Sequence, residues 1–147
     1  MGYKIVAKPR AWWPVTWTGA AEDGSLVENT IELRFLLLKV DDAAGFLREM
    51  QAAQLAEQQE GVVLSQVYAE LVAQIADDWR GVEAENGEPL RWDVPPRWRE
   101  DLDENGRRKS LIAPNLKLLM GEGGLYTHIF NAFREVLAAQ PKIREGN

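Results

Sequence analysis

The alternation of apolar and polar residues predicts a small antiparallel sheet near the N-terminus. Residues 28–40 (ENTIELRFLLLKV) begin with strict alternation, the pattern of a strand that is buried on one face. From Leu36 onward both faces are apolar, which predicts that another layer covers the strand there. Residues 3–8 and 12–18 also have strand character. Because proline cannot donate to a ladder, Pro14 places the second of these at a sheet edge or a bulge.

A helical period follows in two long segments. The apolar residues within 62–79 recur at spacings of three and four, which predicts a helix with one wide buried stripe. Gly81 stands where a left-handed C-cap would end it. Residues 125–139 have a similar stripe, and Pro141 is expected to end that helix. These two helices are the firmest expectations, so strand in either would contradict the pattern.

The remaining segments are shorter or less regular. Residues 43–59 carry strong helix formers after Asp41-Asp42, which is a plausible N-cap. The pair Asn86-Gly87 suits a type I′ turn in a short hairpin or reverse turn. Residues 91–110 are rich in proline and charge, so we expect an irregular, mobile and dispensable excursion. A short helix is expected within 111–120, entered past Pro114.

Together these patterns predict an α+β fold, with a small antiparallel N-terminal sheet followed by a mostly helical region. A chain of 147 residues fits a single domain. Its expected parts are a β-rich region (1–40), helices and a turn (41–90), the irregular excursion (91–110) and C-terminal helices (111–141).

Charge and composition exclude several classes of function. The net charge is −6, which argues against a nucleic-acid binder because such a protein needs a cationic surface. The chain has no cysteine, so disulfides and thiolate chemistry are excluded. The sequence has neither a signal-peptide core nor an apolar run that could span a bilayer, so we expect a protein that stays in the cytoplasm and does not enter a membrane.

Candidate catalytic groups are few and scattered. The single histidine, His128, lies off the apolar stripe of the last predicted helix, and no serine stands in a nucleophile elbow. The glycine-rich residues 121–124 lack the lysine of a phosphate loop. An unfamiliar enzyme that uses Asp77, Asp78 and His128 is the alternative, but neighbouring carboxylates on a helix diverge. We therefore expect a non-enzymatic protein with no catalytic, cofactor-binding or metal-binding residues.

Six tryptophans favour an interaction surface, since exposed indoles are frequent hot spots. The alternative is that they only cap the core. We expect the partner-binding surface on the 62–79 helix and the turn that follows it, at Leu64, Val67, Leu71, Ile75, Trp79, Leu90 and Trp92. We expect self-association along the aromatic edge strand, through Trp12, Trp13 and Trp17.

The order of these parts resembles the tail assembly chaperones of long-tailed (siphovirus-type) bacteriophages. The resemblance is most specific around residues 79–90 and in the last thirty or so residues. It is carried in order by residues 4–6 (KIV), 30–35 (TIELRF), 76–82 (ADDWRGV), 87–90 (GEPL), 115–119 (NLKLL), 129–133 (IFNAF) and the closing Gly146-Asn147.

The resemblance implies a homo-oligomer in the bacterial host cytoplasm that is absent from the finished virion. Such a protein coats the long helical tape measure protein and helps to recruit tail tube subunits. The sequence leaves open whether a frameshifted longer product exists. An acidic mimic of nucleic acid that inhibits a nuclease, or another small adaptor, is the alternative.

Overall fold

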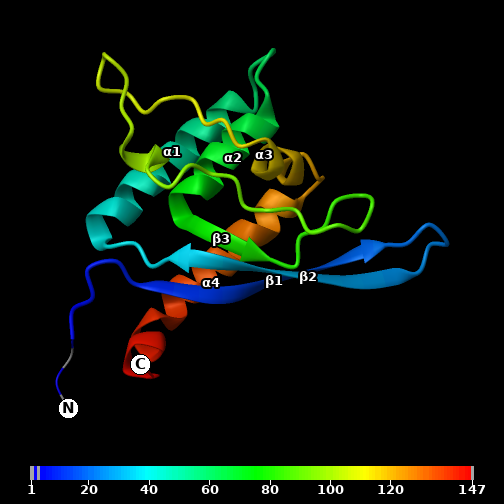
Figure 1. The fold of residues 1–147 in the computed structure, drawn as a ribbon, viewed down its shortest axis with the longest axis horizontal. Coiled ribbons are helices and arrows are strands. Elements are labelled where there is room, and N and C mark those ends of the chain that lie inside the picture. The colour runs from blue at the N-terminus through cyan, green and yellow to red at the C-terminus, as the bar shows by residue number, and fades with distance from the viewer. Residues whose placement is uncertain (1, 3, 147) are drawn as a thin grey trace.

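The computed structural model describes Gly2 and residues 4–146, with side chains described as far as Ala139. Within this range the chain forms an α+β fold, as the sequence predicts (Figure 1). Its elements are, in order, β1 (Arg10–Ala20), β2 (Leu26–Leu36), α1 (Val40–Ala56), α2 (Leu64–Ile75), β3 (Ala76–Arg80), the 3-10 helix η1 (Trp98–Glu100), α3 (Pro114–Met120) and α4 (Leu125–Gly146).

The three strands form an antiparallel sheet in the order β1-β2-β3. On the inner face of β2, Ile31, Leu33 and Phe35 are buried, as their alternation predicts. The helix α4 lies directly on this face, where Phe133 packs against Phe35 with ring centroids 5.7 Å apart. Phe46 of α1 contacts the same Phe133 edge-to-face at 5.6 Å, so α1 covers α4 and the sheet end together.

The third strand corrects the prediction of one helix over residues 62–79. The helix α2 ends at Ile75, and Ala76–Arg80 pairs with β2 as β3. A register shift between Arg34 and Phe35 gives β3 a bulge, so that Ala76 and Trp79 are both buried although they are three residues apart. That spacing is also the helical one, so apolar positions alone could not separate the two structures.

Of the two strands predicted before residue 20, the first does not form and the second does. Residues 4–9, which precede β1, are called the N-terminal arm. Residues 4–8 form no strand in the described chain, so the prediction of a strand over 3–8 is wrong for those positions, and Tyr3 lies outside the described residues. A strand needs a neighbour to pair with, and β2 ends at Leu36. Beyond it, the Leu37 N–H donates to the Pro9 carbonyl at 2.9 Å and the Lys39 ammonium donates to the Val6 carbonyl at 2.8 Å. The edge strand β1 does contain Pro14, opposite Glu32.

Two helix boundaries also differ from the prediction. The N-cap of α1 is Lys39, and among the described residues no side chain caps this end. Asp41 and Asp42 lie in the first turn instead, where the helix dipole favours negative charge. The helix α4 continues through Pro141 to Gly146 at the loss of one backbone hydrogen bond, because good helix formers follow the proline.

The same turn, with the sequence Glu-Asp/Asn-Gly, occurs in three loops, at residues 22–24, 85–87 and 104–106. In the turn at residues 84–87, the Gly87 N–H donates to the Ala84 carbonyl. Gly87 has a positive φ of 83°, whereas Asn86 does not, because among the described residues only glycines have a positive φ. The type I′ prediction for Asn86-Gly87 is therefore wrong, because a type I turn closed by a left-handed glycine is formed instead. The other two copies end at Gly24 and Gly106.

The segment predicted to be a mobile excursion is anchored in the core. Val94 and Trp98 are buried, and the Trp98 indole N–H donates to the Lys109 carbonyl at 2.9 Å. The Asp93 carboxylate accepts from the Asn115 backbone N–H at 2.7 Å, at the N-terminus of α3. The segment is irregular, but tertiary contacts hold it.

Candidate functional site

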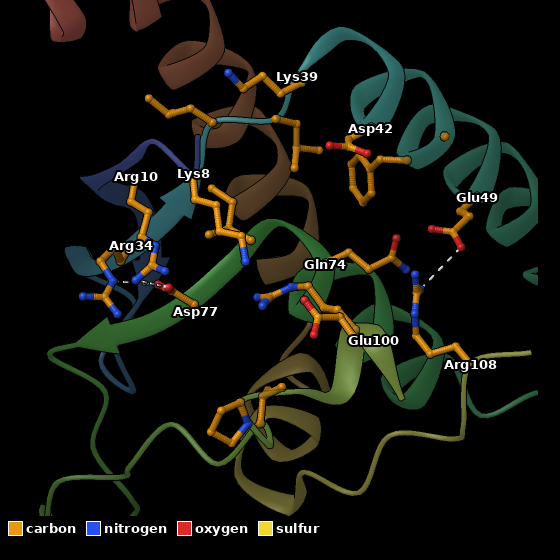
Figure 2. Close-up of a pocket in the computed structure, with 18 of the residues that line it drawn as sticks. Lys8, Arg10, Arg34, Lys39, Asp42, Glu49, Gln74, Asp77, Glu100 and Arg108 are labelled. Atoms are coloured by element: carbon orange, nitrogen blue, oxygen red, sulfur yellow. Dashed lines mark hydrogen bonds and ion pairs between the residues drawn. The ribbon is translucent and has the colours of Figure 1, made fainter. Parts of the chain in front are cut away.

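A large cleft opens where the N-terminal arm, α1 and the segment after β3 meet (Figure 2). Its volume is about 1390 Å³. Its apolar wall includes the buried side chains of Leu37, Phe46 and Val94 and the half-buried indole of Trp92. We call this site the arm cleft, because residues 7–9 of the N-terminal arm, together with Arg10 at the start of β1, form one side of it.

The lining of the arm cleft is rich in charged side chains of both signs, with one more basic than acidic residue. Its lining contains more basic than acidic side chains, whereas the whole chain has 17 basic and 23 acidic residues. The basic residues are Lys8, Arg10, Arg34, Lys39, Arg48, Arg99 and Arg108, and the acidic ones are Asp41, Asp42, Glu49, Asp77, Asp93 and Glu100.

One carboxylate, Asp77, pairs with two arginines of β1 and β2 on one side of the cleft. The Arg34 Nε donates to Asp77 Oδ1 at 2.6 Å, and Arg10 Nη1 lies 3.1 Å from Asp77 Oδ2, as Figure 2 shows. The hydrogen bond that Arg34 donates to the Asp77 carboxylate raises the pKa of Arg34. The bulge in β3 explains this placement, because it turns Asp77 toward the arginines of β1 and β2. The sequence assigned Asp77 to a helix surface, where these pairings could not be foreseen.

A third arginine approaches from η1. Arg99 is partly buried, and its Nη2 donates to the Ala76 carbonyl at the start of β3. The Arg99 Nε is buried and has no acceptor among the described residues. Burial lowers the pKa of Arg99, because the charged guanidinium loses hydration there. Sequence analysis missed this residue because it treated its whole segment as a surface loop.

The structure divides the residues expected to bind a partner. Leu71, Ile75 and Trp79 are buried within the chain's own core, Val67 is half-buried, and only Leu64 is exposed. The stripe on α2 is therefore occupied by the sheet, α3 and α4. The Trp79 indole N–H donates to the carbonyl of half-buried Leu90 at 2.6 Å.

Trp92 is the member of that set that lines the arm cleft. Its ring meets Trp79 edge-to-face with centroids 5.3 Å apart. Trp79 is thus a core residue and its neighbour Trp92 connects the core to the cleft.

The three tryptophans expected to mediate self-association lie on different faces of β1. Trp13 donates from its indole N–H to the Glu135 carboxylate of α4 at 3.2 Å, and Trp17 stacks on His128 with ring centroids 6.2 Å apart. Both face the helical layer. Trp12 points to the opposite face of the sheet, where the Arg80 guanidinium lies 3.5 Å from its ring centroid. Trp12 is therefore the one on the face of the sheet away from the helical layer, where it is half-buried.

The polar side chains that line the arm cleft are those of charged residues and one glutamine. Among the described residues that line it there is no serine, threonine, tyrosine, cysteine or histidine. Across the described part of the chain, no three His, Cys, Asp or Glu side chains are grouped to hold a metal ion. Asp77, Asp78 and His128 do not meet, because His128 packs on Trp17 whereas Asp77 binds Arg10 and Arg34.

Two further observations bear on the class of protein. No helix in the described residues combines the length and apolar character needed to cross a membrane. Comparison with protein-family models, with curated proteins and with solved structures found no match.

Proposed function

We propose that this chain is a non-enzymatic phage tail assembly chaperone that binds a helical segment of the tape measure protein in the arm cleft. In this role it works as a homo-oligomer and helps to recruit tail tube subunits. The observation that carries the proposal is the arm cleft, with an apolar wall bordered by charge, in a chain whose motifs resemble this family.

The volume of the cleft is that of a short helical segment. An α-helix is about 10 Å across with its side chains and rises about 1.5 Å per residue. A cylinder of that width would fill 1390 Å³ over about 18 Å, or roughly three helical turns. A segment of this length buries one apolar stripe against a groove and leaves its polar face toward the charged rim.

The chemistry of the wall supports the same partner. Phe46, Leu37 and Trp92 offer aromatic and aliphatic contact area to an apolar stripe. The charged side chains around them discriminate among amphipathic helices by the charges beside the stripe. A tape measure protein, which is long and helical, presents many such segments before the tube encloses it.

The test is co-expression with the tape measure protein encoded in the same tail gene cluster. We expect the wild-type chain to keep that protein soluble and to be captured with it. Ala52→Arg places a long charged side chain into the cleft from an exposed position on α1, so it should abolish capture while the melting temperature stays nearly unchanged.

Gln51→Arg is the matched control, because Gln51 is the exposed neighbour of Ala52 and does not line the cleft. Capture that survives Ala52→Arg would show that the partner binds elsewhere. A tape measure protein that remains insoluble with the wild-type chain would contradict the chaperone function itself.

A further inference from the structure

Two of the three Glu-Asp/Asn-Gly turns contain an asparagine followed by glycine, at Asn86-Gly87 and Asn105-Gly106. In such a pair the glycine backbone nitrogen can attack the side-chain amide of the asparagine, because glycine has no Cβ to obstruct the approach. Asparagine is a thermolabile residue for this reason. Both asparagines are exposed in loops, so both are accessible to water.

The backbone of the two turns is alike and does not distinguish the two sites. The Gly87 N–H donates to the Ala84 carbonyl at 2.8 Å, and the Gly106 N–H donates to the Asp103 carbonyl at 3.0 Å. Both glycines have a positive φ, 83° at Gly87 and 74° at Gly106. Each attacking nitrogen is therefore held by a hydrogen bond of the same kind.

The side chains of the two asparagines differ. Asn86 Oδ1 accepts from the Glu88 backbone N–H at 3.1 Å, which fixes this amide beside the residue that follows the glycine. In the other turn the equivalent N–H, that of Arg107, donates to Asp103 Oδ1 at 2.9 Å. The Asn105 side chain consequently makes no hydrogen bond with the described residues and is free to rotate toward the backbone.

We propose that Asn105 is a site of non-enzymatic deamidation, and that the hydrogen bond from the Glu88 N–H protects Asn86 from the same reaction. The Gly106 nitrogen loses its proton to solvent and forms a bond to Asn105 Cγ, ammonia leaves, and a cyclic succinimide results. Water then opens the ring at either of its two carbonyls. The product is aspartate or isoaspartate. In both cases one water is consumed, one ammonia is released and the chain gains one negative charge.

The loop that carries Asn105 also contributes to the arm cleft. Arg108 lines the cleft, and its guanidinium lies 5.1 Å from the ring centroid of Trp98. The bridge between Leu102 and Arg108 closes the loop around Asn105. Isoaspartate adds a methylene to the backbone inside this closed loop, and either product adds a carboxylate close in sequence to Asp103. The reaction therefore alters the loop that holds Arg108 at the cleft.

The first experiment incubates the folded protein in mildly alkaline buffer and follows the two sites by tryptic digestion and mass spectrometry. Trypsin releases them in separate peptides, residues 81–91 and 100–107. We expect Asn105 to deamidate about fivefold faster than Asn86, the factor that corresponds to a net hydrogen bond of about 1 kcal/mol. Equal rates at the two sites, or a faster rate at Asn86, would overturn the proposal.

The same incubation in concentrated urea separates the effect of the fold from that of the sequence. Both sites have the local sequence Glu-Asn-Gly, so their rates should be similar in the unfolded chain. Both rates should rise, because unfolding releases the two glycine N–H groups, and the rate at Asn86 should rise more. A preference for Asn105 that is as large in urea as in the folded protein would contradict the protection of Asn86.

Asn105→Gln and Asn86→Gln are matched variants, because glutamine keeps the amide but closes a larger ring more slowly. Asn105→Gln should remove most of the acidic form that accumulates in the folded protein, as measured by ion-exchange chromatography. Asn86→Gln should remove little of it. The opposite order would show that Asn86 is the reactive site.

The isoaspartate form, isolated from the incubated protein, tests the effect on the loop. We expect it to unfold at a lower urea concentration than Asn105→Asp, which adds the charge without the extra methylene. Equal urea midpoints would refute the effect on the loop and leave the deamidation site standing.

Discussion

At the scale of single residues, a stacked tyrosine pair joins α2 to α4. The rings of Tyr68 and Tyr126 are almost parallel, with centroids 4.2 Å apart. The Tyr68 hydroxyl donates to the Glu57 carboxylate at 2.5 Å. Burial raises the pKa of both phenols to about 12, and the hydrogen bond to Glu57 adds to this for Tyr68. The neutral phenols therefore stabilise the contact between the two helices.

The pair predicts a loss of stability in strong base. An unfolded tyrosine has a pKa of about 10, so the stabilisation is complete below that pH and is lost as pH rises toward 12. We expect the urea midpoint to fall across this window, whereas the tyrosinate absorbance of Tyr68 and Tyr126 in the folded protein should rise only near pH 12.

Tyr126→Phe is the control. It removes one of the two ionisable phenols of the pair, so the urea midpoint should fall less steeply with pH. Ionisation of both phenols near pH 10 in the folded protein would show that their pKa values are not raised and would contradict the prediction.

At the scale of elements, the segment between β3 and α3 shows how an irregular stretch becomes part of a core. The Trp98 ring is covered by the Arg108 guanidinium, 5.1 Å from its centroid, and its indole N–H is satisfied by Lys109. The strand-like bridge from Leu102 to Arg108 brings both ends of the loop together. Sequence composition suggested that deleting residues 91–109 would lower the free energy of unfolding only slightly, whereas these contacts indicate a larger decrease.

We therefore predict that Trp98→Ala lowers the free energy of unfolding by about 3–5 kcal/mol, the range for deletion of a large buried aromatic side chain. Leu102→Ala, in the same segment but 54% exposed, should change it by less than about 0.5 kcal/mol. Urea unfolding measures both. Equally small effects would mean that the segment is as dispensable as its composition suggested.

At the scale of the whole molecule, the hairpin of β1 and β2 projects beyond the helical layer (Figure 1). The strand β3 pairs with β2 only between Glu32 and Phe35, so the distal half of the hairpin has two strands. Leu26, at 79% exposed, and Val27 lie near its tip. Two-stranded ribbons are marginally stable alone, so we propose the tip of this hairpin as a contact between copies of the chain.

Under the proposed self-association, sedimentation velocity should show a mass that grows with concentration. Leu26→Lys should weaken this association, because it places charge on the exposed tip. Leu118→Lys changes another exposed leucine, on α3 and away from the hairpin, and should leave association unchanged. A monomer at every concentration, or equal effects of both variants, would contradict the role of the hairpin.

The sequence by itself determined the parts of the fold that depend on local periodicity. Alternation placed Ile31, Leu33 and Phe35 on the buried face of β2, because successive side chains of a strand point to opposite faces. The 3.6-residue period similarly located α2 and α4, since a helix must bury one stripe to be stable. Proline in β1 marked an edge strand for the same local reason.

Only the tertiary structure decided what depends on pairing between distant segments. Ala76–Arg80 forms a strand because β2 has a free edge beside it and because Arg34 and Arg10 bind Asp77, and a helical spacing of apolar residues could not reveal either. The arm cleft likewise brings Lys8, Trp92 and Arg99 together from separate parts of the chain. The periodicity of the sequence indicates whether a residue is buried, but which residues it contacts depends on how the elements pack.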